Sequence, residues 1–191
     1  MKTHQRAIVA ALGTAVLAAL TLAPAASAST TEDLLIQVIP GVTTEVKESN
    51  STFLCPPNQV LTSRQHIGDE NGRTQYTCSR ILINSELVTV SSDLENAVLR
   101  ERDSNYTARA DFAMVARSHK GDENGSTTYS AAAMSWHGRT VGLTNYRWTI
   151  PMRESSHIGQ AAFNEVMTGR KHSGDENGNT SYQFATVTVL P

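Results

Sequence analysis

The stretch HIGDENGRTQY, residues 66–76, decides the fold prediction because it occurs three times. It returns as HKGDENGSTTY at residues 119–129 and as HSGDENGNTSY at residues 172–182. The histidines that open the copies stand at positions 66, 119 and 172, so the spacing is 53 residues in both steps. A constant interval of this length indicates a repeat in which each copy folds as one supersecondary unit. We therefore expect three units, at about residues 31–83, 84–136 and 137–189.

The repeat resolves the secondary structure of a segment that is ambiguous by itself. DLENAVLRER, residues 93–102, has helical propensity. Its equivalents, PGVTTEVKES at 40–49 and YRWTIPMRES at 146–155, are rich in residues typical of strands or carry Pro151. Because equivalent segments should share a structure, all three are predicted to be extended.

Each unit then holds about four short strands, which gives about twelve in the chain. The sequence therefore predicts an all-β fold with pseudo-three-fold symmetry. A β-prism of three four-stranded units and a β-trefoil both satisfy this count. The repeats contain no Gln-x-Trp signature, and the two tryptophans, Trp136 and Trp148, lie at unrelated positions of the repeat. The β-prism is the favoured fold, and the β-trefoil is the alternative.

The first 28 residues are predicted to be a secretory signal peptide. Lys2 and Arg6 give a basic start, residues 7–22 form an apolar run, and Ala26-Ser27-Ala28 is a small-residue cleavage site. A membrane anchor is the alternative, but the run is short for a span and no second apolar stretch follows. We expect cleavage after Ala28, a secreted (extracellular) protein, and a single domain over residues 29–191 without a transmembrane anchor.

The charge of the chain limits the classes of partner. The formal net charge is −2, and it becomes about −4 once Lys2 and Arg6 are removed with the signal peptide. A weakly acidic chain without basic runs disfavours nucleic acid or an anionic membrane as the main partner.

Two cysteines, Cys55 and Cys78, form an even pair in a chain that is expected to be exported. A disulfide between them is the prediction, and a catalytic thiol is the alternative. Both cysteines belong to the first unit. Their equivalents are Ala108 with Ala131, and Ala161 with Phe184. The disulfide would therefore be an addition to the repeated framework.

Asn71-Gly72 between two strand-like segments predicts a hairpin at the centre of each unit. We expect a three-residue loop, Glu70-Asn71-Gly72, with Gly72 at positive φ and with Asp69 accepting hydrogen bonds from N–H groups of the turn. In that register one face of the hairpin carries Arg64, His66, Thr74, Tyr76 and Cys78. The other face is polar and differs between copies, as expected for contact with water. Upstream, a basic residue followed by glutamate also recurs, as Lys47-Glu48, Arg100-Glu101 and Arg153-Glu154.

The shared residues allow two interpretations. In the structural one, the Asn and Gly shape the turn, while Arg, His and Tyr satisfy one another in a polar network between sheets. In the other, the turns and the shared face bind a ligand, and a sugar suits Asp and Asn side chains beside a Tyr ring. The candidate ligand-binding residues are Asp69, Asn71, His66 and Tyr76 in the first unit, Asp122, Asn124, His119 and Tyr129 in the second, and Asp175, Asn177, His172 and Tyr182 in the third.

Metal sites and catalysis are less well supported. Calcium takes about six to eight oxygen ligands, whereas Asp69, Glu70 and Asn71 are adjacent, so their side chains diverge. Three equivalent histidines could hold zinc, but one histidine per unit suits a structural hydrogen bond at least as well. The chain has no Gly-x-Ser-x-Gly or His-Glu-x-x-His pattern. We expect no metal, no cofactor and no enzymatic activity.

Two stretches, CPPNQVLTSRQHIGDENGRTQYTC at 55–78 and FNEVMTGRKHSGDENGNTSYQFATV at 163–187, resemble the repeated motif of bacterial β-prism modules. One such module is appended to perforin-like proteins of bacteria. The resemblance implies a β-prism that recognises a surface, with Asp69, Asn71 and their counterparts near exposed turns. It does not imply pore formation, because residues 29–191 leave no room for that second domain. We expect a lectin-like module that binds carbohydrate or a cell surface, or alternatively an adaptor or accessory subunit of a secreted protein assembly, such as a toxin.

Overall fold

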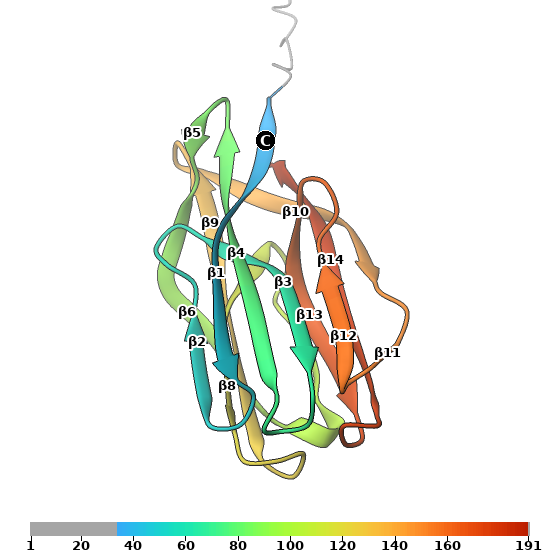
Figure 1. Ribbon diagram of the computed structural model, residues 1–191. Helices are drawn as coiled ribbons and strands as arrows, with labels where there is room; N and C mark the ends of the chain where they lie inside the picture. The colour runs from blue at the N-terminus through green and yellow to red at the C-terminus, as the bar shows by residue number, and fades with distance from the viewer. Residues whose placement is uncertain (1–33, 191) are drawn as a thin grey trace, which may run out of the picture. The chain divides into compact units, whose positions relative to one another are not determined.

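The computed structural model describes residues 34–190 (Figure 1). This part of the chain consists of antiparallel strands, and its one helical element is the 3-10 turn η1 (Glu101–Asp103). The prediction of an all-β fold is confirmed. The expected signal peptide, residues 1–28, lies outside the described residues. Among residues 34–190, no helix has the length and apolar character needed to cross a membrane.

The strands recur with the period of the sequence repeat. The first unit contains β1 (Ile36–Lys47), β2 (Ser51–Leu54), β3 (Val60–Ile67) and β4 (Arg73–Ile83). The second contains β5 (Glu86–Leu87), β6 (Thr89–Arg100), β7 (Asn105–Thr107), β8 (Phe112–Lys120) and β9 (Ser126–Trp136). The third contains β10 (Arg139–Trp148), β11 (Met152–Arg153), β12 (Ser156–Gln160), β13 (Glu165–Ser173) and β14 (Asn179–Val189). Each unit has four strand positions if the two-residue β5 is left aside and β10 and β11, which both pair with β14, are counted as one interrupted strand. Of the segment 93–102 that was predicted to be extended, residues 93–100 are strand, whereas Glu101 and Arg102 lie in the 3-10 turn η1, so that end of the prediction was wrong.

The short second strand of each unit pairs with a strand of the next unit instead of with its own. Strand β2 pairs with β8, β7 pairs with β13, and β12 returns to pair with β3. Each sheet therefore has three strands from one unit and a fourth from the unit before it, as in the order β1-β4-β3-β12 (Figure 1). A two-residue pairing of β9 with β10 joins the second and third sheets. Because the exchange is cyclic, no unit completes its sheet alone.

The three strands β3, β8 and β13 pack against one another and bring the repeated residues together. Along β4, for example, Thr74 and Tyr76 come first after the turn, and Ile81 and Ile83 come last. Two apolar clusters follow this order. One contains the three repeated tyrosines and the disulfide, and the other contains Ile81, Ile83 and aliphatic side chains from the other sheets. The polar residues of the repeat therefore lie between the turns and the apolar core.

Cys55 and Cys78 form a disulfide, with a Cα–Cα distance of 5.8 Å, as predicted. Cys55 directly follows β2, the strand given to the second unit, and its N–H donates to the carbonyl oxygen of Val115 there. Cys78 lies in β4 of the first unit. The disulfide thus ties the exchanged strand back to its own unit, a covalent link for which the other units have alanine or phenylalanine.

The turn between β3 and β4 is longer than predicted. Ile67 pairs with Arg73, so the loop has five residues, Gly68 to Gly72, and the three-residue loop was wrong. Both registers place the same side chains on the same face, so the predicted inward set of Arg64, His66, Thr74, Tyr76 and Cys78 is confirmed, and all five are buried. The longer loop is held from outside the hairpin, because Glu48 and Ser49 donate backbone hydrogen bonds to the carbonyl oxygens of Gly72 and Glu70.

The two glycines of the turn have different functions from those predicted. Positive φ occurs at Gly68 (108°) and not at Gly72, so that part of the prediction was also wrong. Gly72 is required instead by close approach, because a Cβ atom there would lie 2.2 Å from the carbonyl oxygen of Ile67. The predicted function of Asp69 is confirmed, since its Oδ1 accepts a hydrogen bond from the N–H of Asn71 at 2.8 Å.

Candidate functional site

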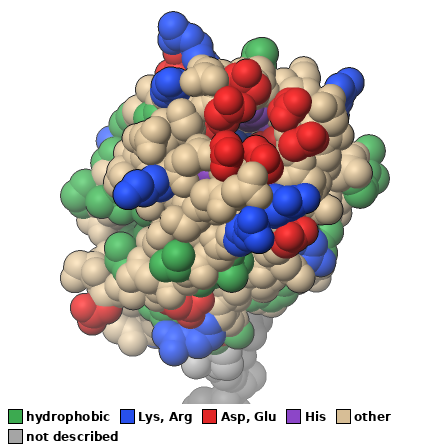
Figure 2. All heavy atoms as spheres, turned by 90° about the horizontal axis from the view of Figure 1, so that it is seen from below, with side chains coloured by type: hydrophobic (Ala, Val, Ile, Leu, Met, Phe, Trp, Pro, Cys, Tyr) green, Lys and Arg blue, Asp and Glu red, His purple; other side chains and the backbone are tan. Residues whose placement is uncertain are grey.

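The three turns gather at one end of the described domain, which we call the turn end. Figure 2 shows this end, where acidic side chains surround a hollow with imidazole groups at its base. The hollow contains a cavity of about 40 Å³, room for only a few water-sized molecules. Its lining residues are Glu48, His66, Asp69 and Glu70, with their equivalents Glu101, His119, Asp122 and Glu123, and Glu154, His172, Asp175 and Glu176.

The rim consists of the predicted tips, and each tip has the same internal bonds. Besides the Asp69 contact, the side-chain amide of Asn71 donates to Glu70 at 3.0 Å. The other two units repeat both bonds within 0.2 Å: the Asn124 and Asn177 N–H groups donate to Asp122 and Asp175, and their side-chain amides donate to Glu123 and Glu176. The Asp and Asn side chains are exposed in all three units. Since these bonds use one oxygen of each Asp carboxylate, the tips are held in place and still present acceptors to solvent.

The floor is a closed ring of three arginines and three glutamates. Each arginine forms an ion pair with the glutamate of its own unit, at 2.9 Å for Arg64–Glu48 and at 3.1 Å for both Arg117–Glu101 and Arg170–Glu154. Each also pairs with the glutamate of the preceding unit, at 2.7 Å for Arg117–Glu48 and Arg170–Glu101 and at 3.2 Å for Arg64–Glu154. Positive and negative charges thus alternate around the ring, which joins all three units.

The repeated tyrosines lie beneath this ring and do not reach the surface. Each arginine donates to the tyrosine hydroxyl of the preceding unit, at 2.7 Å for Arg64–Tyr182, 3.1 Å for Arg117–Tyr76 and 2.8 Å for Arg170–Tyr129. The tyrosine rings are at most 1% exposed, and Tyr76 and Tyr129 stack on Phe53 and Tyr106. The tyrosines therefore offer no ring face to a ligand. The predicted polar network between the sheets is confirmed for the arginines and tyrosines, whereas the repeated histidines do not bond either of them.

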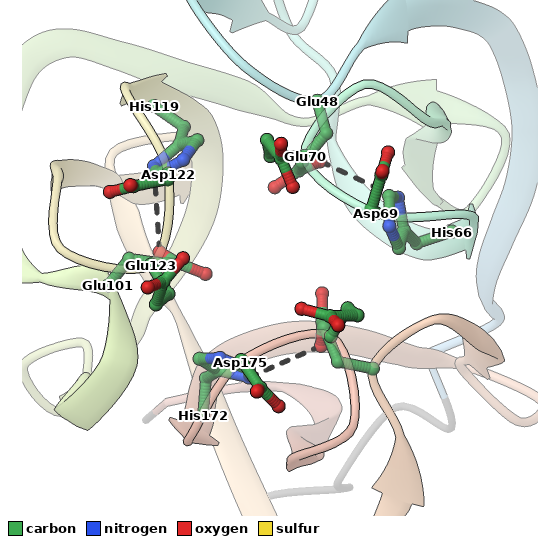
Figure 3. Close-up of a pocket in the computed structure, with 12 residues that line it drawn as sticks. Glu48, His66, Asp69, Glu70, Glu101, His119, Asp122, Glu123, His172 and Asp175 are labelled. Atoms are coloured by element: carbon green, nitrogen blue, oxygen red, sulfur yellow. Dashed lines mark ion pairs between the residues drawn. The ribbon is translucent and has the colours of Figure 1, made fainter.

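The three repeated histidines line the same cavity as the rim carboxylates and the floor glutamates (Figure 3). In the first unit the Nδ1 atom of His66 lies 2.8 Å from the Thr74 hydroxyl, which donates to Glu48, and Nε2 lies 3.0 Å from the carbonyl oxygen of Gly68. His119 has the same threonine contact through Thr127. Both nitrogens of His66 are thus occupied within its own hairpin. Among residues 34–190, no three His, Cys, Asp or Glu side chains are arranged to hold a metal ion.

The third unit departs from this pattern. The Thr180 hydroxyl donates to the carbonyl oxygen of Lys171, at 3.1 Å, instead of bridging His172 and Glu154. As a result, Nδ1 of His172 faces Oε2 of Glu154 directly at 3.4 Å, compared with 3.8 Å for the other two His–Glu pairs. Dashed lines in Figure 3 mark the three pairs.

Charge within the floor is balanced. Burial opposes ionisation of Glu48, but Arg117 and Arg64 outweigh it and hold the pKa of Glu48 well below its ordinary value. For Glu101 and Glu154 too, burial raises the pKa, the charges of the neighbouring arginines lower it by more, and the net pKa is lowered. Burial, and then the charge of the neighbouring arginine, lowers the pKa of His66 and of His119. At neutral pH the ring therefore holds three positive and three negative groups, and the acidic character of the turn end comes from the rim.

A further histidine, His157, enters the network from β12. Its Nε2 lies 3.0 Å from Nη1 of Arg64 and 2.7 Å from the Tyr182 hydroxyl, and its Nδ1 lies 2.7 Å from the carbonyl oxygen of Glu154. Burial, followed by the charge of Arg64, lowers its pKa to about 4. The equivalent positions hold Ser51 and Ser104.

Several residues of the site had no predicted function. Glu48, Glu101 and Glu154 recur at one phase of the repeat, and that recurrence was the signal that could have paired them with the recurring arginines. His157 breaks the repeat, so no comparison between units indicates its function. No protein-family model, curated protein or solved structure matches the chain.

Proposed function

We propose that the protein is a secreted, non-enzymatic binding module that recognises carbohydrate or another repeated ligand of a cell surface through its turn end. The observation that carries the proposal is the threefold presentation of one exposed carboxylate–amide tip, with Asp69, Asp122 and Asp175 at equivalent places. Three weak contacts of the same kind give high avidity on a surface that repeats its ligand.

The rigidity of the tips supports this proposal. Each turn is held by backbone hydrogen bonds from the residues that follow the first strand of its unit, such as Glu154 and Ser155 to the carbonyl oxygens of Gly178 and Glu176, at 2.9 and 3.0 Å. Beneath the tips, the ring of ion pairs fixes the spacing of the three units. A ligand therefore meets groups that are already in place, which lowers the entropic cost of binding.

A β-prism is the arrangement that we propose for the three sheets. Three sheets of equal composition, each completed by a short strand from its neighbour, surround the packed strands β3, β8 and β13. This arrangement would place three equivalent turns around one axis. We propose no catalytic function, because the arginine and glutamate side chains of the floor are paired with one another and buried.

The alternative is an adaptor or accessory subunit of a secreted assembly. The observation that favours it is the acidic rim, which contains Asp69, Glu70 and their equivalents above a floor without net charge. Such a rim complements a basic surface on another protein and would accelerate association at low ionic strength.

The test replaces the three tip aspartates together, as Asp69→Asn, Asp122→Asn and Asp175→Asn. Asparagine keeps a side-chain oxygen for the turn N–H, so the melting temperature should stay within about 4 °C, equivalent to less than about 1 kcal/mol. Binding to immobilised polysaccharides and to isolated cell walls should weaken by about tenfold or more, because three contacts are lost at once. Asp93→Asn, at an exposed aspartate outside the tips, is the matched control.

Two outcomes would contradict the proposal. If the folded triple variant binds as strongly as the wild-type protein, the turn end does not bind the ligand. Retention of the wild-type protein by an immobilised polylysine peptide, with no retention by any polysaccharide or cell wall, would favour the adaptor instead.

A further inference from the structure

A groove crosses the outer face of the sheet β1-β4-β3-β12, and it shares no lining residue with the cavity at the turn end. The loop between β12 and β13, residues 161–164, forms one wall. The groove has a volume of about 480 Å³, which lies within the range of about 300–1,000 Å³ that is usual for ligand sites.

The floor of the groove is polar but almost uncharged. Cross-strand pairing places Gln65 between Ile158 and Gln75 in one row, and Ser63 between Gln160 and Thr77 in the next. The side chains of Gln65 and Gln160 both line the groove and bring neutral amide groups to it. The single carboxylate among the lining residues, Glu165, is held by Arg147 at 2.7 Å. The floor thus offers amides and hydroxyls with no free charge.

An aromatic side chain stands on the wall of this groove. Phe163 is 86% exposed, although burying an aromatic ring is ordinarily favourable. The backbone beneath it is fixed, because the Asn164 side chain bonds the N–H of Val38 at 3.1 Å and the carbonyl oxygen of Ile36 at 2.7 Å. The N–H of Ala161 also donates to the carbonyl oxygen of Thr62 at 2.9 Å. These bonds fix the loop in a conformation that keeps the Phe163 ring exposed.

The position of the groove recurs on the second sheet, where the equivalent residues line a smaller hollow of about 270 Å³, but the chemistry of the two differs. The positions equivalent to Phe163 hold Pro57 and Ala110. On the third sheet, the equivalent of Gln65 is Lys171, whose ammonium lies 4.0 Å from the centre of the Trp148 ring. Phe163 and the glutamine side chains of the floor are thus specific to the first sheet, whereas the residues of the turn end recur in all three units.

We infer that this groove binds a neutral saccharide. Phe163 stacks against the apolar face of one sugar ring, while the side-chain amides of Gln65 and Gln160 bond the sugar hydroxyls. The absence of free charge favours neutral sugars over acidic or amino sugars. The inference rests on the proposed carbohydrate recognition but assigns it a second site, with an aromatic platform that the buried tyrosines of the turn end cannot supply.

The test is electrophoresis of the full-length secreted protein through native gels that contain mannan, laminarin, xylan or galactan, one in each gel. The wild-type protein should be retarded by at least one of these polymers, and Phe163→Ala should weaken that retardation by about tenfold or more, as expected for a central aromatic contact. Gln65→Ala should weaken it in the same gel. Ile150→Ala, which removes a side chain of similar exposure (80%) elsewhere, is the matched control.

The outcomes separate this inference from the proposed function. Retardation that survives Phe163→Ala but is lost in the triple aspartate variant would overturn the groove and support the turn end. Loss in Phe163→Ala with no effect of the triple variant would support the groove and exclude the turn end. Failure of the wild-type protein to be retarded by any of the four polymers would overturn the inference, while binding to isolated cell walls would still test the turn end.

Discussion

At the residue scale, most of the repeated side chains are buried. The residues that occur in only one unit give that unit contacts or exposed groups that the other two lack. Arg64, His66 and Tyr76 recur because each unit needs the same partners in a buried network. His157 and Phe163 occur once each, in the third unit, and each changes its surroundings. Recurrence of these buried side chains therefore reflects structural necessity, and the departures from the repeat are where the units differ in chemistry.

His157 predicts a loss of stability in mild acid. Its pKa is about 4 in the folded protein, against an ordinary value of about 6.5. Between these values the unfolded chain binds a proton that the folded protein excludes, so the stabilisation is complete above pH 6.5 and is lost as pH falls toward 4. The free energy of unfolding should decrease by up to about 3 kcal/mol across this window from His157 alone.

His157→Ser, which introduces the residue of the equivalent positions, should flatten this pH dependence in urea unfolding measured from pH 7 to pH 4.5. Some slope should remain, because the pKa values of His66 and His119 are lowered in the same direction. His137→Ser removes an exposed histidine and provides the comparison. Equal slopes in wild-type protein and His157→Ser would contradict the assignment.

At the scale of elements, local rules identified the strands and failed at the turn. The segment 93–100 is a strand despite its helical propensity, because its neighbours in β9 complete the sheet. The turn at Gly68 to Gly72 is longer than the Asn-Gly signal predicts, because backbone groups of Glu48 and Ser49 bond its carbonyl oxygens. Those partners lie about twenty residues away in sequence, beyond the reach of turn rules.

The disulfide between the end of β2 and β4 should contribute measurably to stability. Replacing both cysteines by alanine frees a chain segment that spans a sequence separation of 23 residues, and the free energy of unfolding should fall by about 3 kcal/mol. Alanine occupies both equivalent positions in the second unit, so the packing cost should be small. Urea unfolding of the double variant, beside wild-type protein with and without reductant, measures this. Identical midpoints for oxidised wild-type protein and the double variant would disprove the contribution.

At the scale of the whole domain, strand exchange and the ring of ion pairs make the three units interdependent. Each ring arginine joins two glutamates from different units, and each exchanged strand completes the sheet of another unit. Cooperative unfolding in one transition is the consequence, because loss of one unit leaves its neighbours with an open sheet and unpaired buried charge.

Arg117→Met tests this interdependence. The variant leaves Glu48 and Glu101 with one arginine each and removes the donor to the Tyr76 hydroxyl. Breaking a buried ion pair on one side typically costs about 3–5 kcal/mol, so the melting temperature should fall sharply in a single transition. Arg80→Met, at an exposed arginine, should change the free energy of unfolding by less than about 0.5 kcal/mol. Calorimetry that resolved a separate transition for the second unit would contradict the interdependence.

The sequence by itself determined the three units, their strands, the inward face of each hairpin and the disulfide. These properties depend on local periodicity and on comparison between copies, such as Arg64, Arg117 and Arg170 at one phase. Only the tertiary structure decided which unit supplies each partner. Arg64 meets Glu154 across 90 residues of sequence, and the Tyr182 hydroxyl across 118.

The candidate site also has some features that the sequence predicted and others that only the tertiary structure determined. The exposure of the tips could be predicted from the turn residues in the sequence. The burial of the tyrosines and the groove beside Phe163 could not be predicted in this way. Both result from strand exchange, which places β12 of the third unit beside β3 of the first. Pairing between distant strands is set by the packing of the complete core, and the sequence pattern of any one strand does not specify its neighbour.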